Sequence, residues 1–326
     1  MRPDLLSTIL VATTFAFAPP LAARGLSLED VNKAELAARS ARNSPAINVK
    51  AQVLLDHARF SPGVIDGRRS DTYANALLAF QQKNGLRTSG ELDDATWKKL
   101  TESPEPALIT YTISAADLKG PFVERIPDDY AKKAELARLD YTGPVELLAE
   151  RFHMDEKLLQ QLNPGKSFDQ AGTVIAVANV NVKPVALDAR AAKLEADKTR
   201  SMVRVLARDG TLLAAYPASI GSEEKPAPSG QLKVVRIAHA PTYTYNPEFK
   251  FRGVKADREL KIAAGPNNPV GAVWIALNQK SYGIHGSAEP HKVGKVGSHG
   301  CVRMTNWDAL ALARIVRKGT VVEFVE

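Results

Sequence analysis

The spacing of apolar residues changes along this chain, and the change limits the folds open to it. In the first half, residues such as Ile47, Ala51 and Leu54 recur at helical intervals, which predicts helices that bury one face. From about residue 202, β-branched residues gather in short runs between turn residues, a pattern typical of strands. The sequence therefore predicts a multidomain α+β protein whose last domain is mainly β.

A length of 326 residues suggests about two domains with room for a small third one. Proline-rich and glycine-rich stretches separate the periodic segments, which places the boundaries between them. The expected parts are a leader at 1–23, a helical domain at 24–104 with its core at 47–100, a small α/β domain at 105–182 and a mainly-β domain at 183–326.

The core at 47–100 is predicted to be three short helices. Tyr73, Leu77 and Phe80 form a helical stripe, and Asp93 is placed to cap a further helix. The layout "VLLDHARFSPGVIDG…ALLAFQQKNGL…GELDDATWKKL" resembles the peptidoglycan-binding family of small helical domains. The resemblance implies that this part binds the cell wall, while its apolar residues form its core.

The second part is predicted to hold two helices and a strand. Pro144 is a good first helical residue, and Asp155 can cap the next helix, which stops at "NPG". The run "AGTVIAVANV" then indicates a strand. This order resembles a LysM domain, a module that binds the amino-sugar chains of peptidoglycan and chitin. A plain structural spacer is the alternative.

The third part carries strand signals with one helix among them. "MVRVLARDGTLLAAYPASIG" predicts a hairpin around Asp209-Gly210. Thr305 or Asn306 can cap a helix just after the chain's one cysteine. Further strand candidates are "QLKVVRIAHA", "GAVWIALN", "YGIHG" and "GTVVEFVE".

The first residues predict export from the cytoplasm. Arg2 precedes an apolar stretch from Leu5 to Ala18, and small residues precede a cleavage position after Ala23. This is the pattern of a secretory signal peptide, so the mature protein is expected across the inner membrane, in the periplasm or the cell wall. Asp4 is unusual in the charged end, which leaves open an uncleaved leader that anchors the chain at the membrane.

The net charge of +7 favours acidic partners such as an anionic wall polymer, a membrane surface or nucleic acid. An ordinary solvated surface would carry the same charge. Blocks of Lys and Arg and clusters of stacking aromatics, which mark nucleic-acid sites, do not occur in the sequence. Nucleic acid is therefore not an expected partner, and peptidoglycan is the partner that the resemblance of the helical part implies.

The one cysteine, Cys301, lies in "YGIHGSAEPHKVGKVGSHGCVRM" with three of the six histidines. A single cysteine in an exported protein is an intermolecular bridge, a reactive thiol or a buried inert residue. A nearby imidazole can convert the thiol to the nucleophilic thiolate. Gly300 permits a tight turn that can point the backbone N–H groups of His299, Gly300 and Cys301 at an oxyanion. These residues predict acyl transfer by a thiol.

The same run resembles the L,D-transpeptidase catalytic domain, which has a histidine-glycine pair, a spacer and then "SHGC" followed by an apolar residue and Asn or Arg. The segment "GPNNPVGAVWIALN" also resembles the family's run before the histidine strand. The likeness covers the whole third part. It implies a sandwich-like sheet fold with the cysteine in a cleft, and chemistry that needs no cofactor.

The resemblance implies a role for each matching residue. Cys301 is the nucleophile, and His285 is the base and later the acid. The backbone of His299, Gly300 and Cys301 forms the oxyanion turn, which Ser298 supports. The spacing of the residues does not by itself exclude His299 as the base.

Arg303 and Gly286 are the expected substrate-binding residues, with Arg303 stabilising the site or binding a substrate carboxylate. The family cuts the bond between the diamino acid in third place and the terminal D-alanine of a stem tetrapeptide. It holds the acyl group as a thioester and passes it to an amine, which belongs to another stem, a lipoprotein lysine or an amino acid. The third part is expected to do this alone on soluble peptides, while the first two hold it on the wall.

Three alternatives come from the same residues. With water as acceptor, the thioester chemistry gives a carboxypeptidase or releases wall-linked protein. A catalytically dead wall-binding scaffold is a second alternative. A zinc site is the third, since His285, His291, His299 and Cys301 are zinc-binding residue types, although their spacing matches none of the usual zinc patterns. No metal is expected.

Overall fold

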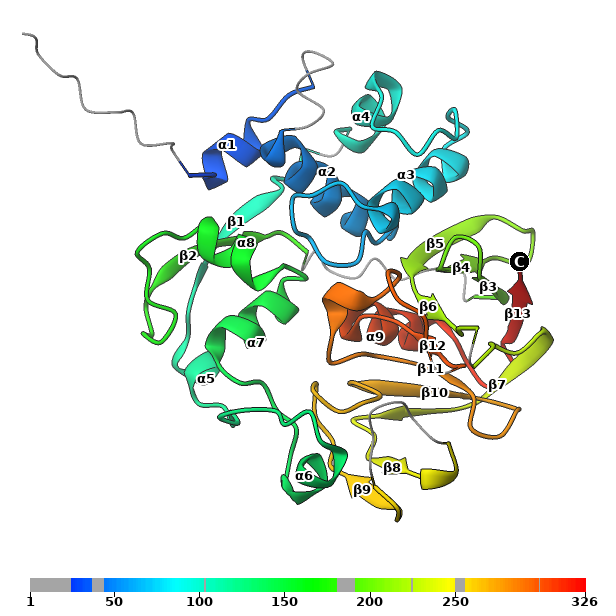
Figure 1. Ribbon diagram of the computed structural model, residues 1–326. Coiled ribbons are helices and arrows are strands. Elements are labelled where there is room, and N and C mark those ends of the chain that lie inside the picture. The colour runs from blue at the N-terminus through cyan, green and yellow to red at the C-terminus, as the bar shows by residue number, and fades with distance from the viewer. Residues whose placement is uncertain are drawn as a thin grey trace, which may run out of the picture.

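A computed structural model describes residues 25–36, 44–102, 104–180, 191–223, 225–249, 256–298 and 300–326. The expected signal peptide lies outside these residues, and so does His299. Within the described ranges, no helix combines the length and the apolar character that a membrane crossing requires. Figure 1 shows the first part of the chain, in blue to cyan, above the third part, and most of the second, in green, to its left; the third part runs from yellow-green to red.

The first part is helical. Asp93 caps its last helix as expected, because the Asp93 carboxylate accepts a hydrogen bond from the Thr96 N–H at 2.8 Å. Ser70 caps the preceding helix in the same way, through the N–H of Tyr73 at 3.3 Å. The helices are α1 (Leu28–Asn32), α2 (Pro45–His57), α3 (Asp71–Lys83) and α4 (Asp94–Leu100).

The second part contains a two-stranded antiparallel sheet with helices between its strands. Pro144 begins α7, and the Asp155 side chain caps α8, as the sequence predicts. The first strand, β1, and the helices α5 and α6 had not been expected; the LysM assignment stays a prediction. The elements are β1 (Leu108–Thr112), α5 (Ala115–Leu118), α6 (Tyr130–Glu135), α7 (Pro144–Arg151), α8 (Glu156–Gln161) and β2 (Val174–Ala178).

The third part is built on one mixed sheet, with nine strands among the described residues in the order β5-β4-β3-β13-β7-β10-β11-β12-β6. The expected hairpin is present, with Gly210 in the left-handed region at φ +84° between β4 and β5. The sheet strands are β3 (Lys193–Asp197), β4 (Met202–Leu206), β5 (Leu212–Pro217), β6 (Ser219–Ile220), β7 (Gly230–His239), β10 (Val273–Leu277), β11 (Gly283–His285), β12 (Val302–Arg303) and β13 (Val321–Val325).

Three further elements complete this part. The strands β8 (Tyr243–Tyr245) and β9 (Leu260–Ile262) form a separate antiparallel pair. The helix α9 (Asn306–Ile315) follows β12 and is capped by the Thr305 side chain, which accepts from the Asp308 N–H. Its buried residues pack with those of the sheet in one apolar cluster.

The first part and the nine-stranded sheet share an apolar core. Residues of β4 and β5, including Met202 and Leu212, lie in one buried cluster with Leu55, Phe60 and Tyr73 of the helical part. The loop after α2 also pairs with the edge strand β5, since the Ser61 N–H donates to the Ala215 carbonyl at 2.9 Å. The helical part therefore covers a sheet edge that would otherwise offer unpaired backbone groups.

Candidate functional site

The pairing of β11 with β12 brings the candidate residues together. β11 and β12 run parallel, and His285 is the register partner of Arg303. The Met304 N–H donates to the His285 carbonyl at 2.8 Å. Cys301 immediately precedes β12, and the charge of Arg303 acts on both the Cys301 thiol and the His285 imidazole, so the three residues lie in one neighbourhood.

The environment of His285 sets its protonation. Its Nδ1 lies 2.7 Å from the Gly286 carbonyl oxygen, which can only accept, so Nδ1 carries the hydrogen and Nε2 is left as an acceptor. The ring stacks on Trp274 with centroids 5.4 Å apart. Burial lowers the pKa of His285 to about 4, although the Gly286 bond opposes the shift. At neutral pH the imidazole is uncharged and can take a proton.

The turn before Cys301 is held to the segment after β6. Ser298, only 3% exposed, donates its hydroxyl hydrogen to the Cys301 carbonyl and accepts from the Gly221 N–H at 2.7 Å. Gly300 has φ +97°, a conformation that side chains with a Cβ disfavour. The contacts of Ser298 fit the expected support of this turn, whose remaining residue, His299, is not described.

The Cys301 thiol rests protonated. It lies 3.5 Å from the carbonyl oxygen of Ser281, to which it can donate. Burial raises the pKa of Cys301 to about 11, and a backbone hydrogen bond from Gly283 and the charge of Arg303 only partly oppose this. The thiol and the imidazole of His285 are thus both uncharged near neutral pH.

Arg303 is a half-buried cation beside the thiol. One of its terminal nitrogens donates to the Gly297 carbonyl at 2.8 Å. Burial lowers the pKa of Arg303, while the charge of Glu289 opposes the shift. Within the part of the chain that the structure describes, its guanidinium forms no ion pair, so donor groups remain for an anion.

A helix of the second part stands beside this site. Tyr130 of α6 packs edge-to-face against Tyr243 and Tyr245 of β8, at centroid distances of 6.3 and 5.5 Å. Burial raises the pKa of Tyr243, and Cys301 adds to the rise. Burial also raises the pKa of Tyr130, which the charge of Arg303 partly offsets. Figure 1 shows α6 next to β9, far along the chain from the cysteine.

Lys133 brings a second cation to the same place. Its ammonium lies 5.1 Å from the centroid of the Tyr130 ring. Burial lowers its pKa, and the carboxylates of Asp128 and Glu289 oppose the shift. Sequence reasoning missed Tyr130 and Lys133, because no local pattern shows that α6 reaches a site formed by residues so distant in sequence.

Gly286 has a packing requirement of its own. A Cβ there would lie 2.2 Å from Oδ1 of Asn306, and one at Gly271 would lie 2.1 Å from the same atom. The Asn306 Oδ1 accepts from the Ala272 N–H at 2.9 Å. Only glycine lets these two backbone segments approach the first residue of α9 so closely. The expected contact of Gly286 with substrate stays a prediction.

The described residues give the zinc hypothesis no support. Among them, no three His, Cys, Asp or Glu side chains come together as a metal site would require. His291 lies on an exposed single turn at Pro290–Lys292.

Comparison with known families yields two matches. Residues 191–324 match a family model described as the L,D-transpeptidase catalytic domain. Residues 49–100 match one described as a putative peptidoglycan binding domain. Both agree with the resemblances found in the sequence, and the first contains all of the candidate catalytic residues.

Individual relatives carry the same description. The putative L,D-transpeptidase YkuD of Bacillus licheniformis is 31% identical over 178 residues, covering 54% of this chain and 90% of that protein. The probable L,D-transpeptidase YbiS of Escherichia coli K12 is 26% identical over 190 residues, covering 57% of this chain and 61% of that protein. A solved structure, L,D-transpeptidase 3 of Mycobacterium tuberculosis with a faropenem-derived adduct, aligns over 42% of this chain and 61% of that chain at 18% identity, with a TM-score of 0.35.

Proposed function

Because the chain belongs to the L,D-transpeptidase family, we propose that it cleaves a peptidoglycan stem peptide through a thioester on Cys301 and transfers the acyl group to an amine. The observation that carries this proposal is the parallel pairing of β11 with β12, which places His285 opposite Arg303, two residues after Cys301. The bond broken joins the diamino acid in third place to the terminal D-alanine.

The first half-reaction forms the thioester. Sγ of Cys301 attacks the carbonyl carbon as its proton passes to Nε2 of His285, because both groups start uncharged. The bond from Nδ1 to the Gly286 carbonyl holds the ring and stabilises the imidazolium that forms. Backbone N–H groups of the turn at Gly300 bind the oxyanion. The imidazolium then gives its proton to the departing nitrogen, and D-alanine leaves.

The second half-reaction reverses the proton path. An acceptor amine attacks the thioester carbon and gives its proton to His285. The intermediate collapses, and the sulfur leaves as thiolate and regains the proton from the imidazolium. Another stem, a lysine of a wall-attached lipoprotein or a free amino acid supplies the amine. If water takes this place, the outcome is a carboxypeptidase or the release of wall-linked protein.

Two cations and a tyrosine cluster give the site its expected substrate preference. Arg303 and Lys133 lie around the aromatic group formed by Tyr130 and Tyr243, and stem peptides carry free carboxylates. We assign to both cations the binding of such a carboxylate, with Arg303 beside the scissile bond and Lys133 farther out. The match at 49–100 points to peptidoglycan as the partner of the helical part, and we place the protein outside the cytoplasm.

The decisive experiment is mass analysis of products from a purified stem tetrapeptide, with and without an acceptor amine. A cross-linked product and an acyl adduct on Cys301 support transpeptidation. A tripeptide formed equally in both arms assigns the acceptor role to water. Unchanged tetrapeptide in both arms, from enzyme that is folded, refutes the proposed function.

A further inference from the structure

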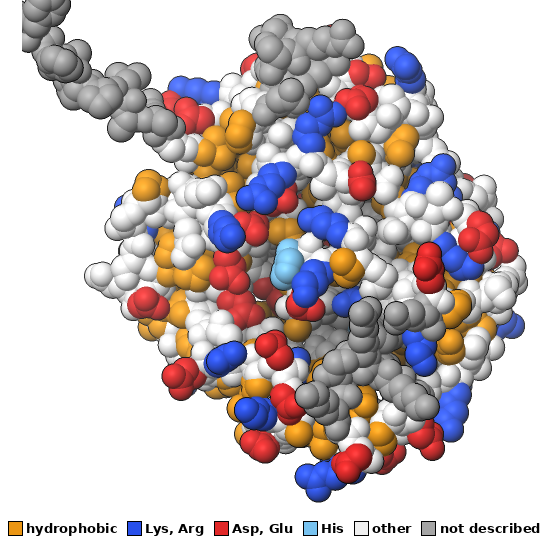
Figure 2. Space-filling view, viewed as in Figure 1, with side chains coloured by type: hydrophobic (Ala, Val, Ile, Leu, Met, Phe, Trp, Pro, Cys, Tyr) orange, Lys and Arg blue, Asp and Glu red, His pale blue; other side chains and the backbone are white. Residues whose placement is uncertain are grey.

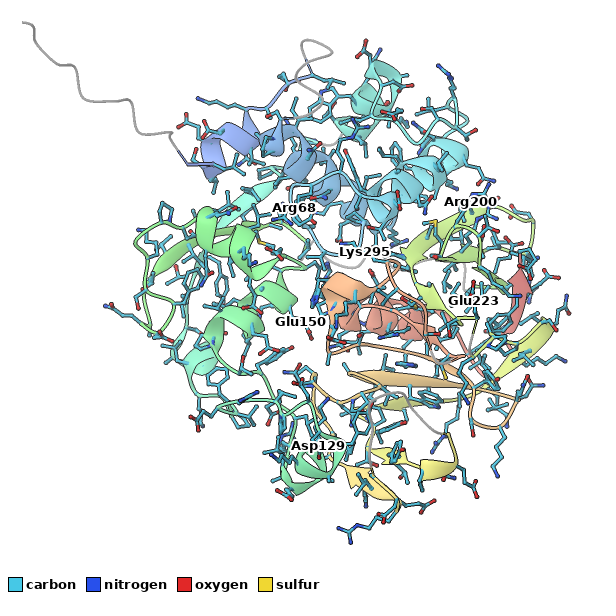
Figure 3. All side chains as sticks on the ribbon, viewed as in Figure 1. Arg68, Asp129, Glu150, Arg200, Glu223 and Lys295 are labelled. Carbon is cyan, nitrogen blue, oxygen red and sulfur yellow. The ribbon has the colours of Figure 1, made fainter. Side chains whose placement is uncertain are left out.

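Glu150 comes from the second part of the chain but contacts the helix that follows the catalytic cysteine. Its carboxylate accepts hydrogen bonds from Nδ2 of Asn306, 3.1 Å from each oxygen, and from the Tyr141 hydroxyl at 2.9 Å. Figure 3 shows Glu150 on the side of α7 that faces α9. Figure 2 shows the surface hollowed near the centre of the same face, with acidic side chains gathered beside it.

The Asn306 amide can sit in only one orientation. Its Oδ1 accepts from the Ala272 N–H at 2.9 Å, while its Nδ2 donates to Glu150 and to the Pro266 carbonyl at 3.1 Å. A flipped amide would place a donor against the Ala272 N–H and an acceptor against the carboxylate. Asn306 is 1% exposed, so water cannot easily replace a lost partner. Glu150 therefore helps to hold this amide in place.

The Asn306 amide in turn contacts Gly286, whose carbonyl orients the catalytic histidine. Oδ1 of Asn306 approaches Gly286 so closely that only a glycine fits there. The Gly286 N–H donates to the Val273 carbonyl at 3.3 Å, and its carbonyl accepts from Nδ1 of His285 at 2.7 Å. Movement of the Asn306 amide would therefore shift the Gly286 carbonyl, which fixes the orientation and the tautomer of the His285 imidazole.

We propose that Glu150 is a positioning residue of the catalytic site, acting through Asn306 and Gly286 on His285. The second part of the chain then helps to complete the active site. The inference rests on the proposed role of His285 as base.

The test uses Glu150→Gln in the full chain. Glutamine keeps the size of the side chain but replaces one acceptor oxygen by an NH₂ group that faces the donor Nδ2 of Asn306. The matched control is Glu156→Gln, the same substitution on the neighbouring helix at an exposed position, and both are assayed above pH 8, where Glu150 is ionised. We expect Glu150→Gln to slow acylation by a β-lactam about tenfold or more, as misplacement of a catalytic group does, with little change in KM for the stem peptide.

A double-mutant cycle separates positioning from general damage. If Glu150 acts through Asn306, Glu150→Gln adds no further loss in an Asn306→Ala background. The ring ¹⁵N signals of His285 should also shift in Glu150→Gln and stay unchanged in Glu156→Gln. Circular dichroism of each variant shows how much of it is folded.

Three results would overturn the inference. The first is an acylation rate of Glu150→Gln equal to that of Glu156→Gln. The second is a loss of rate from Glu150→Gln that is as large in the Asn306→Ala background as in the unmutated chain. The third is a rate of Glu150→Gln that falls only in proportion to its folded fraction. Failure of the proposed function itself looks different, because the unmutated chain would then form no acyl adduct on Cys301.

Discussion

His153 of the second part stacks face to face on Trp307 of α9, with ring centroids 5.1 Å apart and planes 10° apart. Nδ1 of the same histidine lies 3.0 Å from the carboxylate of Asp56 at the end of α2. Close by, the Ser61 hydroxyl donates to Asp308 at 3.0 Å. One imidazole therefore joins all three parts of the chain at a buried cluster of ionisable groups.

This cluster predicts stability that falls as pH rises from about 5 to about 8. Burial raises the pKa of Asp308 from 3.8 to about 7 and that of Glu150 from 4.5 to about 7. Burial alone would lower the pKa of His153, but Asp56 holds it above its ordinary value. The three raised groups bind more protons in the folded state than in the unfolded state, and stability therefore declines with pH. The lowered pKa values of His285 and His57 act in the opposite direction, mainly below about pH 6.5, so the decline is steepest above that pH.

Thermal unfolding at a series of pH values checks this directly. The free energy of unfolding is expected to fall by on the order of a few kcal/mol between the low and the high end of this pH range. Asp308→Asn removes one of the titrating groups and should flatten the dependence. A melting temperature that rises over the same range would contradict the prediction.

Cys301→Ala should abolish turnover while leaving the protein folded, because Cys301 is the chain's one thiol and it immediately precedes the strand that pairs with the His285 strand. The unmutated protein should gain the mass of one carbapenem on Cys301. Product analysis and intact-protein mass spectrometry measure the two outcomes. Turnover near the normal rate in Cys301→Ala would refute the nucleophile assignment.

His285→Gln should acylate very slowly near neutral pH and recover at high pH. Below the Cys301 pKa of about 11, the thiolate fraction of this variant grows about tenfold for each pH unit. The unmutated enzyme should instead be nearly flat between the pKa of His285, about 4, and that of Cys301. Single-turnover acylation against pH is the measurement.

His299→Ala is the comparison for that experiment. It should also lose activity, through the geometry of the oxyanion turn, and high pH should not restore it. If His299→Ala is the variant that recovers and His285→Gln is not, the two histidines exchange roles.

Lys133→Met should raise KM for a stem peptide about tenfold, the effect of a charge-assisted hydrogen bond of ~1.5 kcal/mol, with little change in kcat. Lys132→Met is the matched control, since Lys132 is exposed on the same helix. A peptide with its carboxylates converted to carboxamides should bind both variants equally. Equal KM values for the two variants with the unmodified peptide would show that Lys133 does not bind the substrate.

Residues 185–326 alone should be less stable than the full chain and slower in acylation. Truncation would expose Met202, Leu206 and Leu212, which are buried against the helical part, and would remove Glu150 from Asn306. The shared core argues against the expectation that the third part is self-sufficient. Thermal unfolding and β-lactam acylation of the fragment measure both effects, and full rates from the fragment would restore that expectation.

Much of the local structure could be predicted from the sequence alone. The caps at Asp93, Asp155 and Thr305 formed as expected, because a cap depends on groups within three or four residues of one another. The left-handed conformation of Gly300 likewise follows from its place in a tight turn. The short strands β8 and β9, of three residues each, carry too few residues to show a period, and they escaped prediction.

The arrangement of the site required the tertiary structure. The sequence by itself determined which residue types were present for thiol chemistry, and its "SHGC" run identified the family. Only the packed chain decided that the backbone of Arg303 pairs with that of His285, that α6 brings Tyr130 and Lys133 beside β8 and that Glu150 bonds to Asn306. Those contacts join residues far apart in the chain, and they form because apolar burial and strand pairing bring whole elements together, which no local pattern encodes.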